Sequence, residues 1–209
     1  GRSDPLVRYG PNRASTVGDN GAVATIYGKM GLAASGPPIF VVGDVAYFAT
    51  QSPDTTLVVV GMSLPNKGLS FRKDPDGYSA SYAVDLMLEN GAGVVVQARD
   101  SESVRVPTFR ETSRTDESVI YRRAFHVAPG NYALTYAVRD GSGQRSAGQR
   151  QLIAVPKLSS PALSTLEPVY EAKSRHDLDS LPSYLPAPRA SYVFGVDDSA
   201  AVYLETYGS

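Results

Sequence analysis

The sequence has no cysteine and no tryptophan, and only two histidines among its 209 residues. The absence of cysteine excludes a disulfide framework, a thiolate metal site and a cysteine nucleophile. No stretch approaches the roughly 18 consecutive apolar residues that a membrane-spanning helix needs. Lysine plus arginine (20) nearly balance aspartate plus glutamate (21), so no overall charge attracts nucleic acid or anionic lipid. We therefore expect neither a transmembrane segment in this chain nor a nucleic-acid partner.

Turn-forming residues and tyrosine are abundant instead, with 15 prolines, 19 glycines and 13 tyrosines. From Ile39 onward, short apolar runs such as Phe40–Phe48 and Thr56–Leu64 alternate with turn residues and have no helical pattern between them. This order is typical of an antiparallel sandwich rather than a parallel α/β sheet. The sequence predicts an all-β, immunoglobulin-like β-sandwich.

The clearest strand begins at Tyr78 and runs to Leu88, because alternate residues are apolar along its whole length. The pattern predicts one face in the core and the other mostly in water. Asn90-Gly91 suits a tight hairpin turn that joins this strand to Val94–Val96. A second hairpin is expected between residues 119–127 and 132–138, through the turn at 128–131.

Proline and glycine divide the chain into four parts. Residues 1–38 form an N-terminal arm with a short helix over Ala22–Leu32, and residues 39–157 form the sandwich. Residues 158–189 are predicted to be a proline-rich linker, and 190–209 a hairpin or the start of a second β domain. The chain begins with Gly1 rather than methionine, which suggests processing; an upstream signal peptide or lipid anchor is left open.

Several of these segments carry a resemblance to a known family. They include Leu57-Val58-Val59-Val60, Leu64-Pro65-Asn66, Val127 to Leu134, and Val202 to Gly208. Their order resembles the N-terminal β-sandwich region of bacterial GWxTD-domain proteins. The Gly-Trp-x-Thr-Asp motif itself is absent, since the chain has no tryptophan. The resemblance implies an exported, lipid-anchored or periplasmic β-sandwich without established catalysis.

No arrangement of side chains predicts catalysis. His126 lies on a predicted strand and His176 in the predicted linker, and no serine stands in a nucleophile-elbow motif. Asp74-Pro75-Asp76-Gly77 fits an ordinary turn better than a calcium loop. Two further acidic pairs, in 177–179 and 197–198, are expected to be exposed loop carboxylates. We expect no catalytic, cofactor-binding or metal-binding residue, although a carboxylate pair brought together from distant strands stays open.

Arginine and tyrosine supply the candidate partner contacts instead. Arginines 105, 110, 114, 122 and 123 lie close in sequence, where they form either a basic face or solvated charges balanced by acidic neighbours. Tyrosines outside the alternating core pattern are further candidates. The predicted contact residues are Tyr9, Arg13, Tyr27, Arg122, Arg123, Tyr184, Tyr192 and Tyr207.

The two long irregular segments favour a binding role, because segments that cannot bury themselves gain order by docking. The sequence predicts a non-catalytic, extracytoplasmic structural or interaction module, with the periplasm as the expected location. It would be an accessory or scaffold subunit on a membrane complex of the secretory, respiratory or photosynthetic kind. A carbohydrate-binding module of the cell envelope is the alternative, and an enzyme is third.

Overall fold

The computed structural model of the chain describes residues 39–114, 118–186 and 201–208. The predicted N-terminal arm, the predicted helix over Ala22–Leu32 and the expected strand at 191–194 lie outside the described residues. So do four of the predicted contact residues, which are Tyr9, Arg13, Tyr27 and Tyr192.

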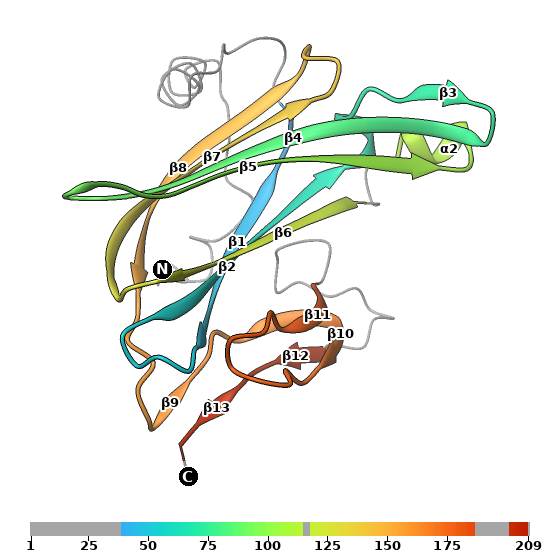
Figure 1. Ribbon diagram of the computed structural model, residues 1–209. Helices are drawn as coiled ribbons and strands as arrows, with labels where there is room; N and C mark the ends of the chain where they lie inside the picture. The colour runs from blue at the N-terminus through green and yellow to red at the C-terminus, as the bar shows by residue number, and fades with distance from the viewer. Residues whose placement is uncertain (1–38, 115–117, 187–200, 209) are drawn as a thin grey trace, which may run out of the picture.

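Two antiparallel sheets form the body of the molecule and confirm the all-β sandwich (Figure 1). The smaller sheet has the order β1-β2-β6, with bounds Val42–Ala49, Thr56–Pro65 and Ser118–Val127. In the larger sheet β4 pairs with β3, β5 and β7, and β7 pairs with β8. Its strands are β3 (Arg72–Asp74), β4 (Gly77–Asn90), β5 (Gly93–Val106), β7 (Gly130–Asp140) and β8 (Ser146–Val155).

The core lies between the two sheets and follows the predicted alternation. From β4, the side chains of Tyr82, Leu86 and Leu88 point inward and are at most 1% exposed. The opposite face of β4 was expected to be mostly solvated, but Asp85 and Met87 on that face are each only 3% exposed. The prediction was wrong at Asp85 and Met87, where β4 lies between two long strands whose side chains flank its own, whereas Ser81 on the same face is exposed.

The two predicted hairpins have different outcomes. β4 and β5 form the first hairpin, and its left-handed φ falls on Gly93 (126°) rather than on Gly91. The second prediction was wrong, because β6 pairs with β2 whereas β7 pairs with β4 and β8. The turn at 128–129 therefore crosses between the sheets, and the Tyr132 hydroxyl closes it by donating to the Ala128 carbonyl at 2.8 Å. Turn residues alone do not distinguish these two connections.

The segment expected to be a linker contains strands. The C-terminal unit, residues 162–186 and 201–207, consists of β9 (Ala162–Leu163), β10 (Glu167–Lys173), β11 (Ser183–Pro186), β12 (Ala201–Tyr203) and β13 (Thr206–Tyr207). β10 pairs with β11 and β12, and β9 pairs with β13. The prolines in this segment did not prevent strands, because Pro168 and Pro186 lie near strand ends.

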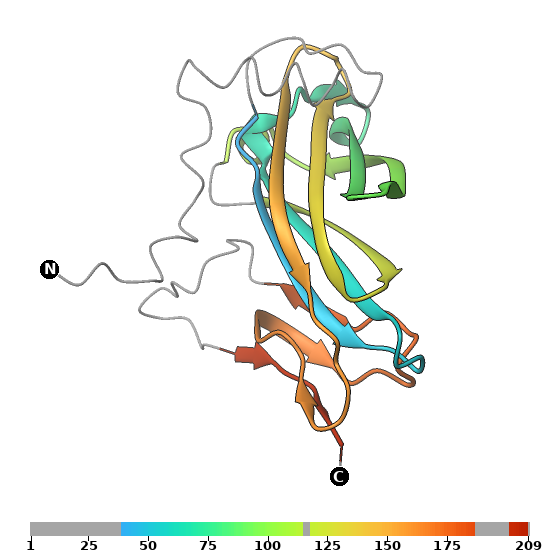
Figure 2. The ribbon, with the colours of Figure 1, turned by 90° about the vertical axis from the view of Figure 1, so that its left-hand side faces the viewer.

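The C-terminal unit packs on the outer face of the smaller sheet, at the end shown lowest in Figure 2. It therefore buries Val169, Tyr184 and Tyr203 against the sandwich instead of forming a separate core. Two short helical turns complete the described residues: η2 (Asn66–Gly68), at the predicted turn, and α2 (Phe109–Thr112). No helix in the described ranges is long and apolar enough to span a membrane.

Candidate functional site

Three aromatic rings join the C-terminal unit to the sandwich. Phe48, on the outer face of β1, lies 6.2 Å from Tyr184 and 5.9 Å from Tyr203 between ring centroids. The two tyrosine rings stack on each other at 5.5 Å. All three side chains are buried, with Val59 of β2 and Val169 of β10 beside them. These rings supply the apolar part of the interface.

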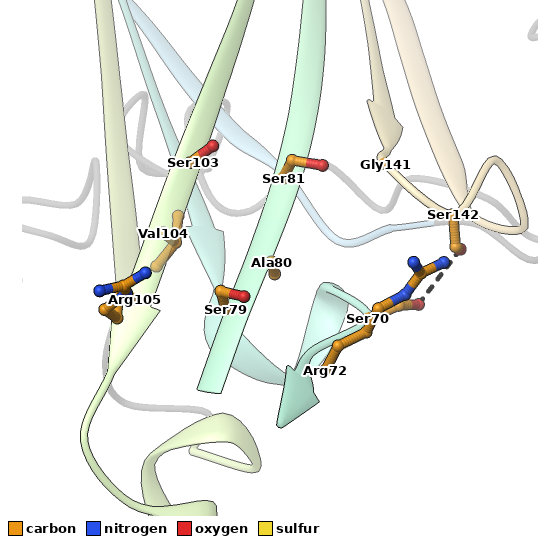
Figure 3. A pocket seen from close by; sticks show the side chains of 10 residues that line it. All are labelled: Ser70, Arg72, Ser79, Ala80, Ser81, Ser103, Val104, Arg105, Gly141 and Ser142. Carbon is orange, nitrogen blue, oxygen red and sulfur yellow. Dashed lines mark hydrogen bonds between the residues drawn. The ribbon is translucent and has the colours of Figure 1, made fainter. Parts of the chain in front are cut away.

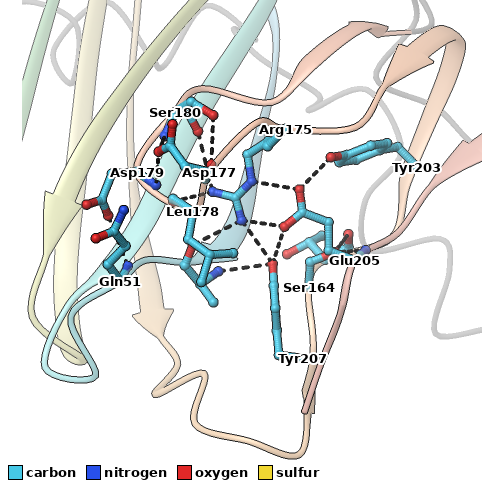
Figure 4. A network of polar contacts seen from close by, with 12 residues as sticks. Gln51, Ser164, Arg175, Asp177, Leu178, Asp179, Ser180, Tyr203, Glu205 and Tyr207 are labelled. Carbon is cyan, nitrogen blue, oxygen red and sulfur yellow. Dashed lines mark hydrogen bonds and ion pairs between the residues drawn. The ribbon is translucent and has the colours of Figure 1, made fainter. Parts of the chain in front are cut away.

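A buried ion pair lies next to these rings (Figure 4). The Arg175 side chain is 3% exposed and donates through Nε to Glu205 Oε1 at 2.8 Å, with a second contact to Oε2. It also donates to the carbonyl of Ala49 at 3.0 Å and to that of Leu178 at 2.5 Å. Its guanidinium carbon lies 5.6 Å from the centre of the Phe48 ring. Arg175 thus connects the sandwich to the C-terminal unit by several bonds at once.

Glu205 completes the network with two tyrosines. The Tyr203 hydroxyl donates to Oε1 at 2.5 Å and the Tyr207 hydroxyl to Oε2 at 2.6 Å. Burial by itself would raise the pKa of Glu205, but the bonds from Arg175, Tyr203 and Tyr207 outweigh it and lower that pKa. Conversely, burial and the bond to Glu205 raise the pKa of Tyr203 to about 12. Both shifts favour a charged Glu205 and a neutral Tyr203, which keeps the hydrogen bond between them.

A second polar cluster lies on the same face of the smaller sheet. Asp44, Gly61 and Arg122 are opposite one another across β1, β2 and β6. Arg122 donates to the Tyr184 carbonyl at 3.0 Å, and its guanidinium carbon lies 4.8 Å from the Tyr184 ring centre. Glu167 approaches Asp44 from β10 and is 4% exposed, and its Oε1 accepts a hydrogen bond from none of the described residues. Burial, followed by the neighbouring Asp44 carboxylate, raises the pKa of Glu167 to about 8.

Three of the predicted contact residues thus meet inside the chain. Arg122, Tyr184 and Tyr207 all contact the interface between the sandwich and the C-terminal unit. Arg123 points to the opposite side of β6, where it donates to Asp100 of β5 at 3.3 Å. Consecutive residues of a strand face opposite ways, so Arg122 and Arg123 do not form one basic face. A role for these four residues in binding another protein stays a prediction.

The other titratable candidates lie near the surface. His126 Nε2 is 4.0 Å from Asp179 Oδ1, and both side chains are 48% exposed. Asp74 Oδ1 accepts from the backbone N–H of Asp76 at 3.1 Å, as in an ordinary turn. Within the described ranges, no group of three or more His, Asp and Glu side chains is placed to hold a metal ion.

The outer face of the larger sheet carries a pocket of about 430 Å³ lined by serine and arginine (Figure 3). Arg72 of β3, Ser79 of β4 and Arg105 of β5 are directly opposite one another in the register. Ser81 and Ser103 form the next pair of β4 and β5 on the same face. The two arginines therefore stand on either side of a floor of small hydroxyl side chains. We call this the Ser/Arg pocket.

A buried carboxylate organises one wall of the Ser/Arg pocket. Asp140 is 1% exposed, accepts from the Ser70 backbone N–H at 3.0 Å and accepts a bond from the Ser142 hydroxyl. Burial would raise the pKa of Asp140, but the bonds from Ser142 and Ser70 outweigh it and lower that pKa. Gly141 permits close approach here, because a Cβ on it would lie 2.0 Å from the Ser81 Oγ. The wall is therefore fixed without a ligand.

The turn between β4 and β5 projects beyond β7 and β8 (Figure 1). Behind it, the 14-residue strand β5 pairs with β4 alone, so its other edge has no backbone partner among the described strands. Val94 and Val95 near the turn are 53% and 46% exposed. A long strand edge with exposed valines is a surface onto which another chain can pair.

Sequence reasoning did not find Arg175, Glu205 or the Ser/Arg pocket. Alternation placed Ser79 and Ser81 on the outer face, but only the pairing of β3 and β5 with β4 brings arginines beside them. Arg175 and Glu205 are 30 residues apart, with no motif linking them.

Comparison with known proteins adds no family. No family model and no curated protein matches the chain. A crystal structure of Bacteroides uniformis β-glucuronidase matches 53% of the chain and 13% of that protein, at 10% identity and a TM-score of 0.36. A structural-genomics target matches 60% of the chain and 93% of its own length, at 15% identity and a TM-score of 0.36. A crystal structure of the putative ApaA protein from Bordetella pertussis matches 58% of the chain and 98% of its own length, at 12% identity and a TM-score of 0.37.

Proposed function

We propose that the chain is a non-catalytic, extracytoplasmic interaction module. It would act as an accessory or scaffold subunit that docks on a larger complex at a membrane. The resemblance to the exported GWxTD-domain proteins supports the location. The secretory, respiratory and photosynthetic assemblies stay equal candidates for the partner.

The observation that carries this proposal is the projecting β4–β5 hairpin with its unpaired strand edge. A partner strand that pairs with β5 gains main-chain hydrogen bonds along the edge. Val94 and Val95 add apolar contact at the tip, where they otherwise face water. Such a surface needs no catalytic group, because the binding energy comes from the backbone and two side chains.

The test is affinity purification of the native protein from solubilised membranes. We expect Val94→Lys to reduce recovery of the bound partner at least tenfold, because a charge on the edge opposes strand addition. Val202→Lys is the matched control, since Val202 on β12 is 55% exposed and Val94 is 53% exposed. A deletion of residues 1–20 tests the predicted arm separately.

Two outcomes would refute the proposal. The first is recovery of the wild-type protein as a free monomer. The second is a loss of partner recovery in Val202→Lys as large as the loss in Val94→Lys. In either case the hairpin would not be the docking surface.

A further inference from the structure

The Ser/Arg pocket lies on the outer face of the larger sheet and contains no part of the proposed docking tip. We propose that this pocket binds the phosphate or sulfate group of a small ligand, held between Arg72 and Arg105 above Ser79. The proposal does not depend on the interaction function, because it rests on other residues.

The register of three strands sets the spacing of the two arginines. Arg72 and Arg105 are both opposite Ser79, so their backbones are two strand spacings apart, or about 10 Å. Two side chains of this length can reach one anion from that distance once Arg72, which extends toward Ser142 in Figure 3, turns toward Ser79. The small side chain of Ser79 leaves the space between them open. Arginine suits this task because its planar donors match the oxygen atoms of phosphate and sulfate.

The donors in the pocket are available. In the part of the chain that the structure describes, the Arg72 guanidinium has no ion-pair partner, and Figure 3 shows it extending toward Ser142. The hydroxyls of Ser79, Ser81 and Ser103 likewise make no hydrogen bond to a described residue. In Figure 3 Ser81 and Ser103 project from β4 and β5. Each hydroxyl adds one donor to an oxygen atom of a bound anion.

The volume of the pocket indicates the kind of ligand. About 430 Å³ is far more than one tetrahedral anion fills and is within the range of small-molecule sites. None of the described residues that line the pocket is aromatic, so stacking on a sugar face contributes nothing to the proposed binding. The anionic group therefore supplies the recognition, and an attached organic group fills the remaining space.

Two carboxylates of the chain compete with a bound anion for Arg105. Arg105 lies 3.4 Å from Asp74 and 4.0 Å from Asp76, and its side chain is 63% exposed. Exposed pairs of this kind hold their geometry weakly, so a bound anion can draw Arg105 away. We therefore expect Asp74→Asn to strengthen anion binding about threefold.

The test is an amide NMR titration of the full chain with inorganic phosphate, inorganic sulfate and a sugar phosphate at constant ionic strength. We expect shifts at the amides of Ser79, Ser81 and Ser103, with dissociation constants of about 1 mM for the inorganic anions. Arg72→Ala should weaken binding at least tenfold. Lys73→Ala is the matched control, because Lys73 is the next residue of β3 and points to the other side of the sheet.

The outcomes separate specific binding from general attraction. Tighter binding of the sugar phosphate than of inorganic phosphate supports an esterified ligand, and equal binding supports the free anion as ligand. The proposal is overturned if the pocket amides do not shift at 50 mM anion (about fifty times the expected constant), or if Lys73→Ala weakens binding as much as Arg72→Ala. Val94→Lys should leave anion binding unchanged, so failure of this site and failure of the proposed function are distinguishable.

Discussion

The two faces of the smaller sheet are covered by different chemistry, the inner face by the larger sheet and one end of the outer face by the C-terminal unit. Toward the larger sheet, β2 presents Val58, Val60 and Met62, each at most 2% exposed, to an apolar core. Away from it, the same sheet meets the C-terminal unit through the Phe48 cluster, the Arg175 ion pair and the acidic contact at Asp44. The inner face is stabilised by apolar area, which does not depend on pH. The outer face depends on a few directional bonds and on charge state.

Substitutions on the inner face of the sandwich are expected to have the largest effect on stability. Leu86 of β4 is fully buried between the sheets, so Leu86→Ala removes apolar contact and leaves a cavity. We expect the free energy of unfolding to fall by about 4 kcal/mol, measured by urea denaturation. Leu152→Ala is the control, because Leu152 lies on β8 of the same sheet and is 81% exposed. A similar loss in both variants would contradict the assignment of the core.

A smaller and more local effect is expected on the outer face. Arg175→Met removes the cation and leaves the Glu205 carboxylate buried without its main partner. We expect the C-terminal unit to lose about 3 kcal/mol of its stability against opening. Hydrogen exchange should show faster exchange at the β10 amides and unchanged protection in β4 and β7. Lys173→Met, two residues before Arg175 at the end of β10, should change neither, because Lys173 is exposed.

If protection fell equally in β4 and in β10, the sandwich and the C-terminal unit would open as one body. That result would remove the distinction between the two faces. It would also mean that the Arg175 network stabilises the whole chain.

The smallest effect on stability is expected at the contact between Glu167 and Asp44, where the effect depends on pH. The pKa of Glu167 is raised from an ordinary 4.5 to about 8, so the folded protein favours the protonated form. Stability from this group is therefore greatest below pH 4.5 and is lost as pH rises toward 8. Glu167→Gln keeps a neutral donor beside Asp44 and should raise stability by about 2 kcal/mol at pH 9, with little change at pH 4.

Thermal unfolding at both pH values measures this difference. Glu171→Gln is the control, since Glu171 lies on the same strand with an exposed side chain. An equal gain at pH 4 and pH 9 would show that Glu167 acts through packing and not through its charge.

Most of the sandwich was predictable because its strands alternate with a period of two. Strands β1, β2, β4, β6, β7 and β8 and the β4–β5 turn follow from apolar runs and turn residues, whereas β3 and the greater part of β5 were not predicted. The sheet assignment of β6 was not predictable, because the turn at 128–129 is compatible with either a hairpin or a crossing. The strands between 162 and 186 were missed because they are short and contain prolines.

The candidate sites were less predictable than the fold. Tyr184 and Tyr207 were selected as unassigned tyrosines, and the structure places both beside Arg175 or Arg122 inside the chain. The Ser/Arg pocket needs the register of three strands. Period-two spacing fixes the face of a residue but not its neighbour on the next strand.

The sequence by itself determined that the projecting hairpin forms, because its alternation and its turn residues are local. It also determined which side chains of β4 face the core. Only the tertiary structure decided that the C-terminal strands cover the outer face of β1, β2 and β6, and that Arg72 and Arg105 stand on either side of Ser79. The physical reason is that local conformation depends on neighbouring residues, whereas these contacts need packing between segments far apart in the sequence. Arg105 reaches Ser79 from another strand, and Tyr47 and Thr165 are 118 residues apart.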